Sequence, residues 1–225
     1  MAKQDLYEKS PVRIFNETTN GGLKAGELGL VVAKKGLGKT SVLVQFGMDT
    51  LLNGKQLVHV SFNQHSGNII SWYDGIYNEI SKKKALGDSP DLREQVFRNR
   101  TILNFNQDNI NLEKVVNTLN ALKASGTNVV GVVVDDVDFE KVQEGDLQTV
   151  SSFAKATKTK VWFSSTVSGE TLADCAPKDL LPYFYAVVRL ASKGNVTQLE
   201  VLKMGKEGAI ETSLKLDSKT LLITK

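Results

Sequence analysis

Hydrophobic and polar positions in the first part of the chain change from a strand-like to a helix-like pattern and back. Residues 28–32 form an unbroken apolar run, which predicts a short buried strand. Apolar residues then recur at helical spacing through 39–51, and 56–62 is a second β-rich run. The helix is long enough to cross between the two strands, so the pattern predicts a βαβ unit with parallel strands.

The middle of the chain repeats this alternation. Helical spacing predicts four more helices, and β-branched runs predict three more strands. The predicted helices are 69–80, 91–98, 112–124 and 145–156, and the predicted strands are 101–106, 129–134 and 161–165. We therefore expect an α/β fold with a mainly parallel central sheet.

The two ends of the chain depart from the alternation. Residues 1–20 are interpreted as a loosely structured N-terminal segment, anchored by Ile14 and Phe15. Beyond about residue 183 no helical pattern separates the β-rich runs, which predicts C-terminal antiparallel hairpins attached to the parallel sheet. These runs are 183–190, 197–204, 210–216 and 221–224. One domain over residues 1–225 is expected.

Composition narrows the class of protein. A chain of 225 residues fits one large α/β domain. Lys and Arg total 28 against 25 Asp and Glu, a mild excess that does not by itself indicate nucleic acid. The single cysteine, Cys175, excludes an internal disulfide framework. The charged N-terminus resembles no secretory signal and no run is long enough for a membrane span, so we expect a cytoplasmic protein.

A glycine-bearing loop connects the first predicted strand to its helix, which is the setting of a phosphate-binding loop. Backbone N–H groups would converge on phosphates, and the positive end of the helix adds to the attraction. Lys39 supplies a cation for the β- and γ-phosphates, and Thr40 offers a hydroxyl to Mg²⁺. Ala33 stands where the usual motif has glycine, and the alternative is an ordinary βα turn with a chance Gly-Lys-Thr. The predicted ATP-binding residues here are Ala33, Lys34, Lys35, Gly36, Leu37, Gly38, Lys39, Thr40 and Ser41.

Two aspartates follow the most β-rich run of the chain. Asp135 is the predicted carboxylate on the metal side, which together with Thr40 would serve Mg²⁺. The alternative is a polar turn after a core strand. Asp136 is a candidate catalytic base if it faces the γ-phosphate, and otherwise a solvated or strand-capping aspartate.

Further similarities extend along nearly the whole chain. Besides the loop and Asp135, they comprise Phe15, residues 21–23 (GGL), 60–62 (VSF), 163–165 (FSS) and 201–204 (VLKM). Together these segments resemble the RecA-type P-loop ATPases, specifically the KaiC-like branch, which is similar to RadA and to the replicative helicase core. The resemblance implies a RecA-like three-layer sandwich, ATP and Mg²⁺ as ligands, and a homo-oligomeric ring or filament with nucleotide between subunits.

The chain departs from this family at two catalytic positions. The family's strand after the loop helix ends in a glutamate that polarises the attacking water, whereas Asn63 and Gln64 stand here. An amide such as Gln64 can orient a water but cannot accept a proton at neutral pH. In the family's hairpin a lysine and an arginine reach the neighbouring subunit's γ-phosphate. Lys203 matches the lysine, but Gly205 replaces the arginine, so we expect slow hydrolysis at best.

Other residues carry weaker predictions. Trp72 either stacks on the adenine, as a side chain at this place does in related helicase cores, or belongs to the apolar helix stripe with Ile69 and Ile76. The hydroxyl residues Ser164, Ser165 and Thr166 either sense the γ-phosphate or bond to the backbone. His65 is interpreted as a surface histidine.

Nucleic acid binding is not favoured by the sequence. A basic cluster comprises Lys82, Lys83, Lys84, Arg93, Arg98 and Arg100, without interleaved aromatic residues. The loops 137–147 and 168–180, which are long in DNA-acting relatives, are short here and carry only Lys141 and Lys178 as basic residues.

Two functions are therefore considered. The first is an ATP·Mg²⁺-binding, KaiC-like protein with weak or no hydrolysis that acts as a nucleotide-dependent switch or assembly scaffold. The alternative is an active RecA-like ATPase that acts on DNA as a recombination or repair accessory.

Overall fold

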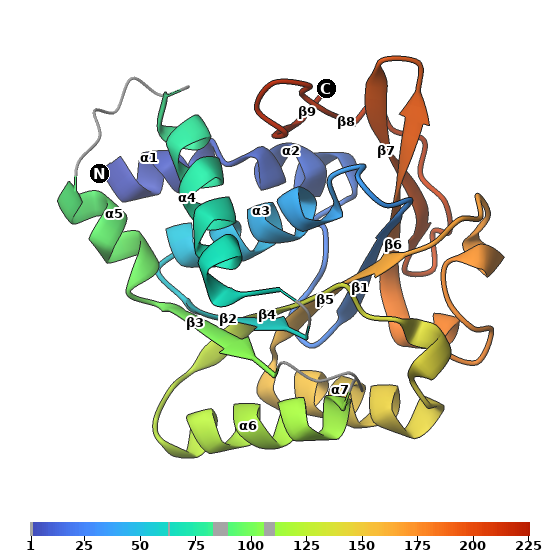
Figure 1. The fold of residues 1–225 in the computed structure, drawn as a ribbon, viewed down its shortest axis with the longest axis horizontal. Coiled ribbons are helices and arrows are strands. Elements are labelled where there is room, and N and C mark those ends of the chain that lie inside the picture. The colour runs from blue at the N-terminus through green and yellow to red at the C-terminus, as the bar shows by residue number, and fades with distance from the viewer. Residues whose placement is uncertain (1, 63, 83–89, 106–110) are drawn as a thin grey trace.

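The structure, a computed structural model, describes residues 2–62, 64–82, 90–105 and 111–225. Their strands form a single nine-stranded sheet in the order β3-β2-β4-β5-β1-β6-β7-β8-β9 (Figure 1). The strands are β1 (Leu28–Ala33), β2 (Gln56–Ser61), β3 (Arg100–Asn104), β4 (Val129–Asp135), β5 (Lys160–Thr166), β6 (Phe184–Lys193), β7 (Val196–Met204), β8 (Lys215–Leu216) and β9 (Ile223–Thr224). The first six are mutually parallel, and β7, β8 and β9 continue the sheet in antiparallel pairing. The expected α/β class with a mainly parallel sheet and antiparallel C-terminal strands is confirmed.

Helices cover both faces of the parallel part, so the layers are helix, sheet and helix. The helices are α1 (Ala2–Glu8), α2 (Pro11–Thr18), α3 (Lys39–Leu52), α4 (Ser66–Lys82), α5 (Pro90–Phe97), α6 (Leu112–Ala124) and α7 (Glu144–Thr157). In Figure 1, α1–α5 lie above the sheet and α6 and α7 below it. Right-handed crossovers explain this division, because the chain moves one way along the sheet from β1 to β3 and the other way from β3 to β5.

The strand sequences reflect burial on both faces. All six residues of β1 are buried, as are six of the seven residues of β4. A parallel strand covered by helices on both sides needs apolar residues throughout rather than in alternation. This is why the continuous runs at 28–32 and 129–134 predicted these strands well.

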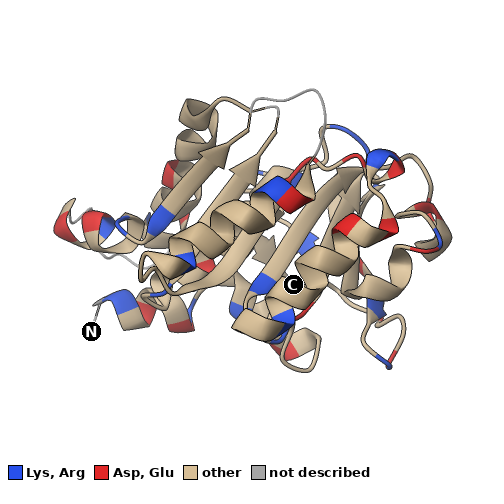
Figure 2. Cartoon of the chain, turned by 90° about the horizontal axis from the view of Figure 1, so that it is seen from below, with Lys and Arg blue, Asp and Glu red and all other residues tan. Residues whose placement is uncertain are grey.

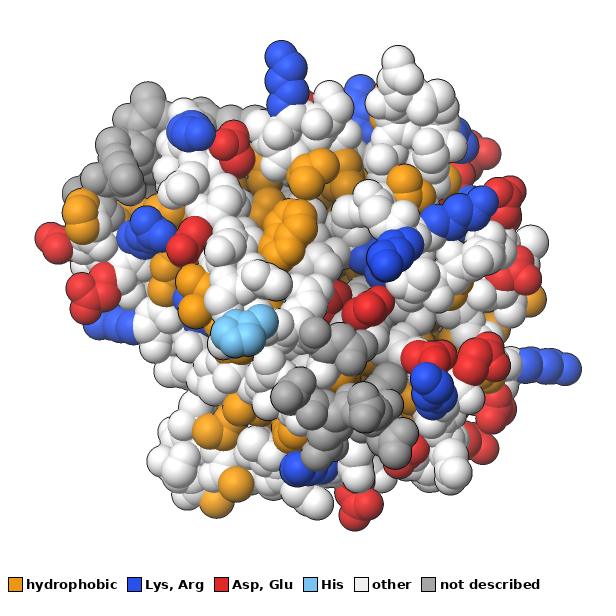
Figure 3. Space-filling model, viewed as in Figure 1, with side chains coloured by type: hydrophobic (Ala, Val, Ile, Leu, Met, Phe, Trp, Pro, Cys, Tyr) orange, Lys and Arg blue, Asp and Glu red, His pale blue; other side chains and the backbone are white. Residues whose placement is uncertain are grey.

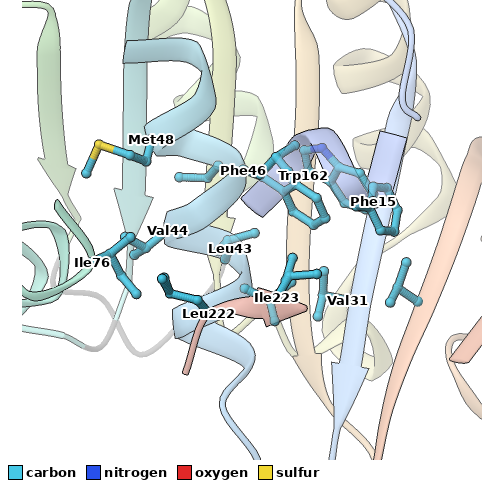
Figure 4. Close-up of a cluster of buried hydrophobic side chains, with 14 of the residues drawn as sticks. Phe15, Val31, Leu43, Val44, Phe46, Met48, Ile76, Trp162, Leu222 and Ile223 are labelled. Atoms are coloured by element: carbon cyan, nitrogen blue, oxygen red, sulfur yellow. The ribbon is translucent and has the colours of Figure 1, made fainter. Parts of the chain in front are cut away.

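One core layer lies between the sheet and α3 (Figure 4). Phe46 of α3 stacks on Trp162 of β5 with ring centroids 4.1 Å apart, and Phe15 of α2 meets Phe46 edge-on at 5.1 Å. Leu222 and Ile223 of the C-terminal segment enter the same layer. The opposite core layer includes a triangle of edge-on rings formed by Phe139, Phe163 and Phe184.

The expectation of a loosely structured N-terminal segment over residues 1–20 is wrong. Ser10 caps α2 by accepting a hydrogen bond from the Val12 N–H, and Pro11 occupies its first turn. Leu6 and Phe15 are completely buried in the core beside α3, while Ile14 is only partly buried. Helices this short are marginal alone, so their stability comes from this packing, which local sequence does not display.

The first C-terminal hairpin, β6 with β7, forms as predicted, but the last two predicted strands are shorter than expected. Beyond β7 the strands are Lys215–Leu216 and Ile223–Thr224, and Ile210 forms an isolated bridge to Val201. A side chain replaces part of the ladder, because buried Gln45 donates to the Leu221 carbonyl at 2.9 Å and accepts from the Ile223 N–H at 2.8 Å. Among the described residues, no helix has the length and hydropathy to cross a membrane.

Candidate functional site

The candidate site lies where the parallel strands β1, β2, β4 and β5 end. Strand register places Ala33 beside Thr166 and Ser61 beside Asp135. The carboxyl ends of parallel strands meet at one edge of a sheet, and the loops that leave them are the usual place for ligands in open α/β sheets.

The connection between β1 and α3 is a compact turn that depends on two glycines. Gly36 and Gly38 have φ angles of +88° and +96°, a region that favours glycine. Ala33, which replaces the usual glycine of the motif, is buried as the last residue of β1 and is not among the residues with positive φ. Alanine at position 33 therefore causes no backbone strain.

This turn leaves several backbone donors free. Within the described residues, Leu37 N–H bonds to the Lys34 carbonyl and Val42 N–H to the Gly38 carbonyl, whereas the N–H groups of Gly36, Lys39 and Thr40 have no protein acceptor. Free N–H groups at a helix N-terminus can bind an anion, and the helix dipole adds to the attraction.

Lys39, the first residue of α3, has most of its side chain buried. Its Nζ donates to Thr166 Oγ1 at 2.8 Å and lies 3.9 Å from Asp136 Oδ1. Thr166 Oγ1 donates in turn to Asp136 Oδ1 at 3.1 Å. The lysine predicted to meet phosphates is thus held by the ends of β4 and β5.

Asp135 is the most heavily bonded acid of the site. Its Oδ2 accepts from Thr40 Oγ1 and from Gln64 Nε2, both at 3.0 Å, and its Oδ1 accepts from Ser164 Oγ at 2.5 Å. Burial raises the pKa of this carboxyl, and the hydrogen bonds from Ser164 and Thr40 offset only part of that rise. A cation beside Asp135 would favour the ionised carboxylate.

Asp136 directs its side chain toward Lys39 and Thr166. Its φ of +57° is left-handed, a conformation that aspartate tolerates better than most residues. The turn is held by Ser164, whose Oγ accepts from the Asp136 N–H at 2.8 Å while donating to Asp135. The two aspartates therefore face different partners, one buried and one half-exposed.

Comparison with protein-family models and with the sequences of curated proteins finds no match to this chain. What the site can do must therefore be argued from its own geometry.

The structure brings together most of the predicted site residues. Thr40 and Asp135 are the pair able to hold a cation, and the described residues contain no cluster of three or more His, Cys, Asp or Glu side chains suited to a metal. Gln64 also belongs to this group through its bond to Asp135. Lys34 and Lys35 are exposed at the rim of the turn. Asn63 lies outside the described residues.

Three predicted residues make contacts with other parts of the protein. The Ser41 hydroxyl donates to the Leu221 carbonyl at 3.0 Å, so it anchors the C-terminal segment. Trp72 is partly buried against the core from α4. Lys203 donates to the Leu181 carbonyl at 2.9 Å and lines a cavity beside Gly26, at the amino end of β1. Burial lowers the pKa of this lysine.

Sequence reasoning missed two supports of the site. Asn104 at the end of β3 donates to the Gln64 carbonyl at 2.7 Å, which fixes the backbone of that glutamine. Leu216 of β8 lies so close to Gly38 that an added Cβ would be 3.0 Å from its Cδ1. Strand order alone could have suggested Asn104, whereas Leu216 arrives from a segment about 180 residues away, which no local pattern reveals.

The basic cluster is largely engaged within the protein. Lys82 pairs with Glu79 and Arg93 with Asp74, each at 2.9 Å, and Arg100 lies over the rings of Tyr73 and Phe97. Lys83 and Lys84 lie outside the described residues. Basic and acidic residues are interspersed in Figure 2, and small hydrophobic patches separate charges on the face seen in Figure 3. Among the described residues, the face seen in Figure 3 carries charges of both signs rather than one extended basic patch.

Proposed function

We propose that the chain binds ATP·Mg²⁺ at residues 33–41 and hydrolyses it slowly or not at all, so that bound nucleotide acts as a switch or an assembly scaffold. The observation that carries the proposal is the approach of Thr40 Oγ1 to Asp135 Oδ2 at 3.0 Å, across 95 residues of sequence. A hydroxyl and a carboxylate beside free helix N–H groups provide what a magnesium triphosphate requires.

Each residue of the candidate site has a part in this proposal. The Lys39 ammonium and the N–H groups of Gly36 and Thr40 would neutralise the phosphates. Thr40 and Asp135 would hold the Mg²⁺ ion, which supplies charge stabilisation to the phosphate oxygens. Ser164 keeps Asp135 oriented through its hydrogen bond.

Slow hydrolysis is expected because the described residues offer only one suitable base. The Gln64 amide already donates to Asp135 and cannot accept a proton at neutral pH. Asp136 is half-exposed and faces Lys39 and Thr166, which makes it the candidate base for residual turnover. Gly205 stands where the family has an arginine, so the chain also lacks that arginine's contribution to the rate of hydrolysis.

The sheet order and the antiparallel C-terminal strands support a RecA-like interpretation of the fold. On that interpretation nucleotide sits between copies of the chain in a ring or filament. Lys203 fits this arrangement, since it pairs with Val187 near the amino end of β6 and would reach a phosphate only on an adjacent copy.

Calorimetric titration with ATP·Mg²⁺ tests the proposal, using Lys39→Ala and, as a matched control in the same loop, Lys35→Ala. We expect Lys39→Ala to abolish measurable binding and Lys35→Ala, an exposed residue, to change it little. A phosphate-release assay should show low turnover, reduced further by Asp136→Asn with binding retained. No affinity for any nucleoside triphosphate with Mg²⁺ contradicts the proposal, and rapid turnover contradicts its slow-hydrolysis part. Native mass spectrometry with ATP·Mg²⁺ reports the number of subunits.

A further inference from the structure

A cavity lies at the amino ends of the parallel strands, whereas the candidate site lies at their carboxyl ends. It has a volume of about 370 Å³ and is bounded by α2, the second half of α3, the starts of β4 and β5, and residues near Gly21. Phe46 and Trp162, which stack on each other in Figure 4, form part of its apolar wall. This volume lies within the range of small-molecule sites.

Positive charge dominates the lining of this cavity. Arg13, Lys55, Lys158 and Lys160 line it, against one carboxylate, Asp49. Arg13 pairs with Asp49, but none of the three lysines forms a salt bridge with any described residue. Lys160 is near enough to Asp49 and Glu27 for their charges to act on its pKa, whereas Lys55 and Lys158 are exposed. The lining still carries an excess of positive charge, which favours an anion.

The ion pair itself is incompletely satisfied. Arg13 uses Nη2 for Asp49 Oδ2 and Nη1 for the Tyr7 hydroxyl, yet its Nε is buried without a hydrogen-bond partner. On the other member, Asp49 Oδ1 is buried without a partner as well. Buried polar groups are nearly always paired, so the Arg13–Asp49 pair beside the cavity lacks part of its usual hydrogen bonding, although the Ser10 side chain helps to lower the pKa of the Asp49 carboxyl.

From this cavity we propose a second ligand site, which binds a small oxyanion that also carries a hydrogen-bond donor. The oxyanion would take the Arg13 and lysine donors, and the donor of the ligand would face Asp49. A protonated phosphate and a hydroxy acid share this chemistry. The proposal does not depend on nucleotide binding at residues 33–41, because none of those residues lines this cavity.

The experiment uses two pairs of anions that differ mainly in the donor. Phosphate retains a P–OH group at neutral pH and sulfate has none, while malate has a hydroxyl that succinate lacks. The chain has two tryptophans. Trp72→Phe therefore leaves Trp162, in the cavity wall, as the sole tryptophan reporter, and Lys39→Ala removes anion binding at the other site. Fluorescence is titrated at constant ionic strength, and amide chemical shifts of the Lys39→Ala protein provide a second readout.

We expect saturable responses with at least one donor-bearing anion binding about tenfold more tightly than its donor-free partner. Lys160→Gln should weaken that binding at least tenfold, and the exposed Lys158→Gln to a smaller degree. Asp49→Asn should reduce the difference in affinity between the two anions of each pair. Lys219→Gln, at the distant C-terminal turn, should leave the affinities unchanged.

Three results overturn the proposal. The first is a response that does not saturate with any of the four anions. The second is equal binding within both pairs, since the inferred role of Asp49 then fails. The third is saturable binding that Lys160→Gln and Lys158→Gln leave unchanged, which places the anion elsewhere.

Discussion

At the carboxyl end of the sheet, Lys39 and Asp136 lie among partners that satisfy them, whereas at the amino end Arg13 and Asp49 pair but keep unsatisfied atoms. The carboxyl-end site takes its free donors from backbone, because a glycine turn opens a helix there. The amino-end cavity takes its charges from side chains on α2, α3 and β5 and on the loops that hold Lys55 and Lys158. The turn at residues 33–41 is contiguous in sequence. The residues that line the amino-end cavity are far apart in sequence and come together only when the chain folds.

Lys39→Ala is expected to have the largest effect, and it tests whether the two ends of the sheet bind ligands independently. We expect ATP·Mg²⁺ affinity to fall at least about 100-fold, equivalent to about 3 kcal/mol, because a nearly buried ammonium no longer meets the phosphates. Calorimetry measures the loss. Phosphate binding at the amino-end cavity should be unchanged in the same protein, and a parallel loss at both ends would mean that the sites are not separate.

A second test concerns a buried histidine in β2, the strand beside edge strand β3. His59 of β2 is completely buried, bonds to the Tyr73 hydroxyl through Nδ1 at 3.1 Å, and leaves Nε2 without a partner. Burial, with a further contribution from Arg100, lowers the pKa of His59 from 6.5 to about 3. Between pH 6.5 and about pH 3, His59 is therefore protonated in the unfolded chain but neutral in the folded chain. The free energy of unfolding falls as pH drops below 6.5.

Urea unfolding measures this pH dependence. From pH 6.5 to about pH 5, we expect His59 to cost up to about 1.4 kcal/mol per pH unit, or about 2 kcal/mol in all. His59→Gln should remove this component, while His65→Gln, which changes an exposed residue, should retain it. Asp49 and Asp135 have raised pKa values and act with the opposite sign, so the difference between the two variants is the informative quantity. Equal acid sensitivity of both variants contradicts the assignment to His59.

The third test concerns the C-terminal segment that supports the carboxyl-end site. Gln45→Ala removes the bonds to Leu221 and Ile223, and we expect unfolding free energy to fall by about 2 kcal/mol. Hydrogen exchange at residues 221–225 should accelerate. Gln198→Ala, which removes one longer bond to the Thr212 carbonyl, provides the control and should leave exchange at 221–225 unchanged. Unaltered exchange in Gln45→Ala would show that packing of Leu222 and Ile223 holds the segment without this side chain.

Sequence patterns predicted the parallel strands and the helices between them because burial on both faces demands continuous apolar runs. They also indicated Lys39, Thr40, Gln64, Asp135, Asp136, Ser164 and Thr166, since strand ends can be read once strands are known. They failed for α1 and α2, whose stability depends on packing against α3, and for Gln45, which replaces part of a strand ladder with a side chain. They gave no sign of the amino-end cavity, because Arg13, Asp49 and Lys160 share no spacing.

The smallest expected effect compares two glycines of nearly equal conformation. Gly36 and Gly126 have φ angles of +88° and +89°, and an added Cβ would meet no atom within 4 Å at either one. Gly36→Ala and Gly126→Ala should therefore each lower the unfolding free energy by about 1 kcal/mol through backbone strain alone. Only Gly36→Ala should weaken ATP·Mg²⁺ binding, because only Gly36 belongs to the loop whose free backbone N–H groups are proposed to bind the phosphates. Calorimetry and urea unfolding of the two variants separate these effects, and equal affinity in both would remove the backbone of residues 33–41 from the phosphate site.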